Sequence, residues 1–166
     1  MRYKIVPEPR GLDTLSAVHR ALPLVPERVE DCCARVVDRT DVLARDDARE
    51  WLTFLQALEL AEETPRGFRR VRTDPETAEL ADAFRRRVYG AEEFLTALEE
   101  TGPVTAGETF DRLRSSVPEW EWERHADPER EWRDRTRRLL AWSVEFGLAT
   151  CDPAGDGERY VPVEDA

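Results

Sequence analysis

Two stretches of this sequence, WLTFLQALELA at 51–61 and LLAWSVEFGLA at 139–149, share one apolar pattern at an offset of 88 residues. The first stretch has the apolar spacing of a helix, and this spacing breaks at Leu60. Apolar residues coincide at six pairs of positions: 51/139, 52/140, 54/142, 58/146, 60/148 and 61/149. A similarity at a fixed offset indicates an internal repeat, so the same local structure is expected twice.

A polar turn and a short β-like segment follow each stretch. The turn residues are Pro65-Arg66-Gly67 in the first copy and Gly155-Asp156-Gly157 in the second. If the second turn is four residues longer, Phe68 aligns with Tyr160 and Val71 with Val163. Glycine and proline at these places are typical of tight turns. Each copy therefore predicts a helix that passes into a β-hairpin.

Further helical segments precede the hairpin in each half. In the first half we expect helices over about 13–22, 26–37 and 45–58. In the second half we expect helices over about 91–101 and 105–115, separated by Gly102-Pro103. A long helix then begins at Asp127-Pro128 and ends near Phe146. The order of three helices and a hairpin thus occurs twice.

Each half resembles the winged helix-turn-helix domains that are common among archaeal transcription regulators. The residues that carry the resemblance lie where the third helix passes into the hairpin: Leu55, Leu58, Leu60, Ala61 and Glu62 in the first copy, and Phe146-Gly147-Leu148-Ala149 in the second. The resemblance implies a mainly α fold with small β-hairpin wings, as two winged-helix domains in tandem. We expect these domains over 1–73 and 91–166, joined by a linker helix over 74–90; the alternative is that this helix begins the second domain.

The composition is acidic and almost free of lysine. The 166 residues carry a net charge of −11, and Lys4 is the single lysine beside 24 arginines. This balance resembles proteins of salt-loving archaea, in which surface carboxylates stay hydrated while salt screens their repulsion. The acidity is therefore poor evidence against DNA binding. Without an 18-residue apolar run or the apolar core of a signal peptide, we expect a cytoplasmic protein with no membrane span.

The basic residues are concentrated in the first half. Residues 1–90 carry a net charge of −1, whereas residues 91–166 carry −10. The predicted first wing has four arginines within seven residues and no acid among them: Arg66, Arg69, Arg70 and Arg72. Arg85-Arg86-Arg87 follows nearby. Such clusters suit phosphate binding. They would equally suit an internal partner, with the arginines facing the acidic second half.

In winged helices the third helix usually reads the DNA groove. Arg45 and Arg49 lie one turn apart on the third helix of the first half, although Asp46, Asp47 and Glu50 surround them. We therefore expect DNA contacts from Arg45 and Arg49 and from the wing arginines. The long helix of the second half mixes five arginines with acids, which predicts a solvated helix with many ion pairs.

Aromatic residues gather in the second half, where Trp120, Trp122, Trp132 and Trp142 lie within 23 residues. Trp142 is expected in the core, whereas Trp120 and Trp122 are either core residues or anchors for a protein partner. The three cysteines lack metal-binding spacing, and buried thiols are expected. Neither a phosphate-binding glycine loop nor a catalytic motif is found, so we expect no enzyme and no cofactor.

The sequence therefore favours a DNA-binding transcriptional regulator or chromosome-associated factor of a halophilic archaeon, acting on double-stranded DNA. An alternative is a tandem winged-helix module for protein–protein interaction without DNA binding. In length and layout the chain is similar to the acidic kleisin-binding subunits of chromosome condensation complexes. The charge of the second half and the tryptophans at 120 and 122 fit this alternative better. A homodimer through that half is a further hypothesis.

Overall fold

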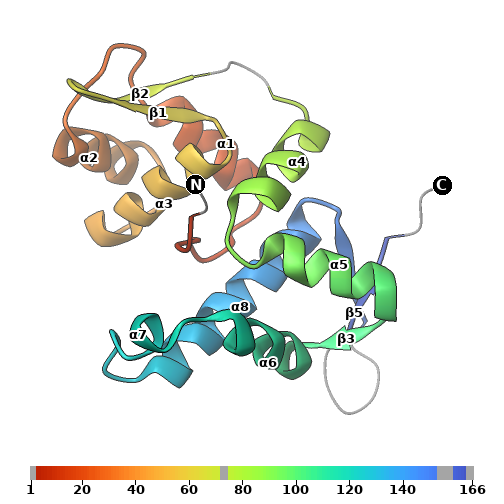
Figure 1. Cartoon of the computed structure of the whole chain (residues 1–166). Coiled ribbons are helices and arrows are strands. Elements are labelled where there is room, and N and C mark those ends of the chain that lie inside the picture. The colour runs from red at the N-terminus through yellow and green to blue at the C-terminus, as the bar shows by residue number, and fades with distance from the viewer. Residues whose placement is uncertain (1–2, 72–74, 153–158, 164–166) are drawn as a thin grey trace. The chain divides into compact units, whose positions relative to one another are not determined.

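The computed structural model describes residues 3–71, 75–152 and 159–163, and the chain forms two compact units, Met1–Val88 and Tyr89–Ala166 (Figure 1). It is mainly helical with two small antiparallel sheets, as predicted. Among the residues described, none of the helices is long and apolar enough to cross a membrane. No group of His, Cys, Asp and Glu side chains among them could hold a metal ion.

The described residues of the first unit form four helices and one hairpin: α1 (Leu12–Ala21), α2 (Val29–Arg39), α3 (Arg45–Ala57), β1 (Ala61–Thr64), β2 (Gly67–Arg70) and α4 (Thr77–Arg87). β1 and β2 are antiparallel, with Ala61 opposite Arg70. Glu27, in the segment before α2, pairs with Phe68 through two backbone hydrogen bonds of 2.8 and 3.0 Å. α2 therefore begins at Val29 instead of residue 26, because the preceding residues are extended along the hairpin.

The described part of the second unit also ends its helices in a hairpin, with one strand and one short helix more before it: α5 (Ala91–Thr101), β3 (Val104–Thr105), α6 (Ala106–Ser116), α7 (Glu119–Trp122), α8 (Pro128–Glu145), β4 (Ala149–Asp152) and β5 (Arg159–Pro162). β3 pairs with the second hairpin strand, β5, just as Glu27 pairs with β2. The Thr105 hydroxyl accepts a hydrogen bond from the Glu108 backbone amide, and the Glu108 carboxylate accepts one from the Thr105 amide. These two bonds form a capping box at the start of α6. Asp127 caps α8 and Pro128 is its first residue, as predicted.

The helix that leads into the hairpin is α3 in the first unit and α8 in the second. Both are called third helices here, because the short helix α7 is additional, and both end with the same backbone geometry. Glu59 and Gly147, 88 residues apart, both have positive φ, 62° and 72°. The amide of the next residue donates five residues back, from Leu60 to Leu55 (2.8 Å) and from Leu148 to Ser143 (2.9 Å). This is the Schellman motif. β1 and β4 then begin at Ala61 and Ala149, again 88 residues apart. The predicted repeat is therefore confirmed where each helix passes into its hairpin, because both copies have the same hydrogen bonds and the same positive φ there.

The aligned apolar residues fill the two cores. Phe54 and its counterpart Trp142 are fully buried. Leu58 and its counterpart Phe146 are only 1% and 3% exposed. In the first unit the Phe54 ring meets that of Phe84 on α4, with centroids 6.5 Å apart. The segment expected as a linker thus forms a helix that packs on α3 within this unit. Trp142 is in the core as predicted.

Two details differ from expectation. The short helix α7, which carries both Trp120 and Trp122, has no counterpart in the first unit and was not predicted. Cys32 and Cys33 are buried as expected, but Cys151 is exposed on β4. The prediction of three buried thiols was therefore wrong, because the first residues of β4 after Ala149 lie on the surface.

Gly67 is required where the first hairpin meets Glu27. Its φ is +124°, and a Cβ atom there would collide with the backbone carbonyl of Glu27. We predict that Gly67→Ala lowers the free energy of unfolding by about 3 kcal/mol, from two lost hydrogen bonds and backbone strain. Thermal denaturation in molar KCl measures this.

Gly107→Ala is the matched control, because Gly107 is exposed within α6 and a Cβ there has space. This control should be neutral or stabilising by up to about 1 kcal/mol. Equal stability of the Gly67→Ala variant and the wild type would show that the pairing of Glu27 with Phe68 does not hold the hairpin.

Candidate nucleic-acid interface

α3 presents one basic face to solvent. Arg45 is its first residue and Arg49 lies one turn later, and both side chains are exposed. Ala48 and Leu52, on the opposite face, are buried, so the helix cannot rotate to hide these arginines. Neither arginine forms an ion pair with another described residue. Asp46 and Asp47 are exposed beside them.

Arg49 also lies near the Cys33 thiol of α2. Burial raises the pKa of that thiol, and the positive charge of the Arg49 guanidinium opposes the rise. A thiol is a weak partner for a guanidinium, so Arg49 keeps its donors for another acceptor.

The turn of the first hairpin presents Arg66. The Thr64 hydroxyl accepts from the Arg66 amide (3.2 Å) and donates to the Gly67 carbonyl (2.9 Å), so the turn is closed by its own residues. The Arg66 side chain is exposed and has no ion pair within the described part of the chain. Arg66 is thus the arginine at the tip of the predicted wing, and it has its guanidinium available.

The other wing arginines are placed differently. Glu62 lies directly opposite Arg69 in the hairpin, and their side chains form an ion pair of 2.6 Å. Arg70 donates to the backbone carbonyl of Arg20 at 3.3 Å. Arg72 lies outside the described residues. The prediction that these arginines form a cluster without acids was therefore wrong for the folded chain. Strand pairing places Glu62 of β1 beside Arg69 of β2.

The arginines at the end of α4 are also paired within the first unit. Arg86 contacts Asp82 (2.8 Å) and Glu59 (3.3 Å), and Arg87 contacts Glu59 at 3.6 Å. Arg87 also lies over the Tyr3 ring, 5.3 Å from its centroid. Asp82, Glu59 and Tyr3 all belong to the same unit as these two arginines. This segment is therefore a structural ion-pair cluster that fastens α4 to the end of α3.

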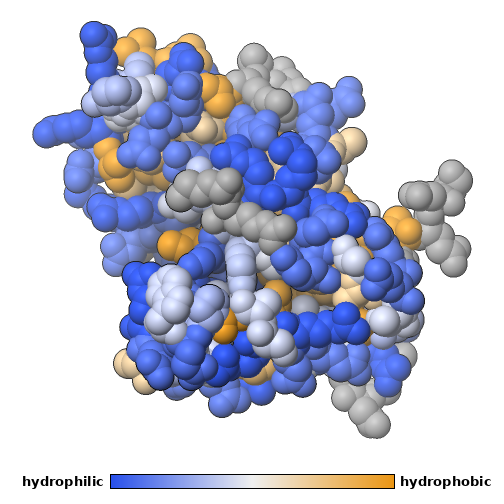
Figure 2. Space-filling view, in the orientation of Figure 1, coloured by the Kyte–Doolittle hydropathy of each residue, from blue (hydrophilic) through white to orange (hydrophobic). Residues whose placement is uncertain are grey.

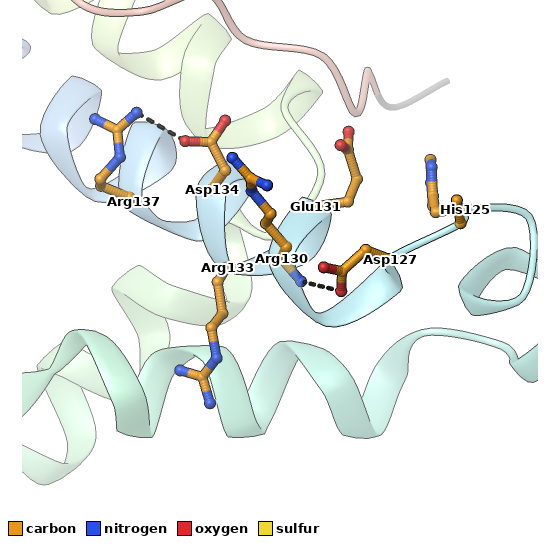
Figure 3. A pocket seen from close by; sticks show the side chains of 8 residues that line it. His125, Asp127, Arg130, Glu131, Arg133, Asp134 and Arg137 are labelled. Carbon is orange, nitrogen blue, oxygen red and sulfur yellow. Dashed lines mark hydrogen bonds and ion pairs between the residues drawn. The ribbon is translucent and has the colours of Figure 1, made fainter.

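In the second unit, α8 carries the ion pairs that the sequence predicted. Each of four arginines pairs with an acid on the same helix: Arg133 with Glu129, Arg135 with Glu131, and Arg137 and Arg138 with Asp134. An open depression runs along the first turns of the helix, and its wall includes Arg130, Arg133 and Arg137 (Figure 3).

The two candidate partner-binding tryptophans have different surroundings. Trp122 is half-buried: its ring lies 6.3 Å from that of Phe110, and the Arg114 guanidinium lies 3.9 Å above it. Trp120 is 64% exposed. The face of the molecule in Figure 2 is mostly hydrophilic, with scattered hydrophobic residues. Trp122 therefore belongs to the packing of its own unit, and Trp120 alone remains a candidate anchor.

Comparison with known proteins agrees with this architecture. The family model described as the halobacterial double winged helix domain matches residues 1–161. No curated protein and no solved structure matches the chain. The resemblance to winged helices of salt-loving archaea, first drawn from the repeat and the composition, is thereby confirmed. The chain belongs to the family of halobacterial double winged helix domains.

Proposed function

We propose that the protein is a DNA-binding regulator of transcription or of chromosome organisation, in which each compact unit is a winged-helix domain. One observation carries the proposal. Arg45, Arg49 and Arg66 are exposed on the third helix and hairpin tip of one unit and form no ion pair with any described residue. In winged helices these two elements are the usual DNA-contacting parts, and arginine binds both phosphates and guanine edges.

High salt shapes how such a site would work. Phosphate contacts weaken steeply as salt rises, because binding releases counterions from the DNA. A protein that works in molar salt gains little from a large basic surface. A few arginines that reach base edges would then supply more of the affinity, and the acidic remainder of the surface would suppress binding elsewhere. The net charge of −11 is compatible with this mode.

The alternative, a protein-interaction module without DNA binding, has less support. The exposed side chain of Trp120 is the feature that favours it. Trp122, which the alternative also invoked, packs within its own unit.

Chromatin immunoprecipitation from cells at their native salt tests the proposal. We predict discrete peaks for the wild type, and their loss in the double variant Arg45→Ala/Arg49→Ala, because both groove-facing arginines are removed. Arg20→Ala is the control, since Arg20 is exposed on α1 and lies outside α3 and the hairpin. An absence of peaks in the wild type, or unchanged peaks in the double variant, would refute DNA binding through α3.

The ion pair in the wing gives a second prediction. Glu62→Gln removes the acid that holds Arg69, so Arg69 becomes free to contact phosphate. We predict roughly a fivefold gain in affinity for duplex DNA, which corresponds to about 1 kcal/mol. Fluorescence anisotropy at fixed KCl measures it. Glu63→Gln removes the same charge from the neighbouring exposed residue, which lies opposite Phe68.

The comparison of these two variants isolates the released arginine. If both variants gain equally, the effect is one of net charge and Arg69 has no part in DNA binding.

A further inference from the structure

The short helix α7 is an addition to the second unit that the fold does not require. In the first unit the chain passes from α2 to α3 through residues 40–44, whereas in the second it passes from α6 to α8 through residues 117–127. The extra length forms α7, which lies at the opposite end of α8 from β5 (Figure 1). Because the first unit closes with the shorter connection, α7 is available for another purpose.

α7 is fixed to its own unit by one side and exposes a tryptophan on the other. The Trp122 ring lies 6.3 Å from that of Phe110, and the Arg114 guanidinium lies 3.9 Å above it. Arg114 also forms an ion pair of 3.2 Å with Glu119, the first residue of α7. Trp120, in contrast, is 64% exposed. A large ring is thus held outward on a helix whose position is already fixed, which lowers the entropic cost of binding a partner there.

The surface around Trp120 is acidic. Residues 117–127 contain four acids and one arginine, a net charge of −3. Glu119 and Glu123 flank Trp120 and are both exposed, and Glu123 forms no ion pair within the described part of the chain. These carboxylates repel the phosphates of DNA, and they equally repel the same surface of a second copy. The surface is therefore complementary to a partner that carries positive charge.

An aromatic ring lets such a partner bind in high salt. In molar salt, exposed carboxylates alone attract a cation weakly, because charges are screened over about 3 Å. A guanidinium that stacks on an indole also removes apolar surface from water, so this contact depends less on salt. The second unit already uses this contact internally, with an arginine guanidinium 3.9 Å from the ring centroid of Trp122, 4.1 Å from that of Phe110 and 4.7 Å from that of Trp132. An arginine of a partner on Trp120 would repeat it.

We propose that α7 is a docking site for another protein, and that Trp120 binds an arginine in a basic segment of that partner. Glu119 and Glu123 contact the neighbouring cationic groups of the same segment. The site uses neither the third helices nor the hairpins, so this inference does not depend on the proposed function. It adds a protein partner on a surface whose acids repel DNA.

Titration of the full chain with an arginine-rich peptide in molar KCl tests this inference. The indole N–H signals of the five tryptophans report on each ring separately by NMR. We predict that the peptide shifts the Trp120 signal saturably and leaves that of the buried Trp142 unmoved. Anisotropy of the labelled peptide measures its affinity. Trp120→Ala should weaken binding at least about tenfold, because it removes the ring that holds the guanidinium.

Matched variants and peptides separate the contributions. Trp120→Phe keeps an aromatic face and should retain most of the affinity. Glu123→Gln should weaken binding by less than about fivefold, because an exposed carboxylate contributes little. Leu43→Ala removes an apolar side chain of the first unit that is 82% exposed, and it should leave binding unchanged. A peptide with glutamine in place of each arginine should leave the Trp120 signal unmoved.

The inference is refuted if the arginine-rich peptide leaves the Trp120 signal unmoved, if Trp120→Ala binds it as tightly as the wild type, or if the glutamine peptide binds equally well. A Trp120 signal that shifts with protein concentration alone would assign this surface to contacts between copies and would also overturn it. Duplex DNA binding is measured on the same proteins. Trp120→Ala should keep the wild-type affinity for DNA, and Arg45→Ala/Arg49→Ala should keep that for the peptide, so each proposal fails or stands separately.

Discussion

The left-handed residue that ends each third helix is the constraint on which the rest of the structure depends. At Glu59 and Gly147 the chain leaves the helix with positive φ, and the next leucine amide returns to a carbonyl five residues back. This turn starts the hairpin at a fixed angle, so the wing and the exposed face of the helix are positioned together. Glycine adopts this conformation freely. Glu59 adopts the same conformation although it has a side chain, which strains its backbone. Its carboxylate forms ion pairs with Arg86 and Arg87 of α4.

Ion pairing decides which arginines can act. Of the arginines singled out from the sequence, Arg69, Arg86 and Arg87 are engaged by carboxylates of their own unit, whereas Arg45, Arg49 and Arg66 are not. An arginine-rich segment is therefore a poor guide to a binding surface in an acidic protein. Its partners come from neighbouring strands and helices, which only the fold brings together.

Much of the fold could be predicted from the sequence, because apolar periodicity and turn residues act locally. The offset of 88 residues located α3, α8 and both hairpins, and α5 was predicted with its observed bounds. The contacts of the candidate site could be predicted from the sequence less well than the fold. The contact of Glu62 with Arg69 depends on strand register, and that of Glu59 with α4 depends on tertiary packing.

Arginine side-chain NMR of the full 19.2 kDa chain tests the central claim most directly. Each Nε–H group reports on its own guanidinium during titration with duplex DNA in KCl. DNA contact through the third helix and wing tip predicts shifts at Arg45, Arg49 and Arg66, with Arg20 unchanged. Saturable binding that leaves these three signals unmoved, or that shifts the Trp120 indole instead, would contradict it.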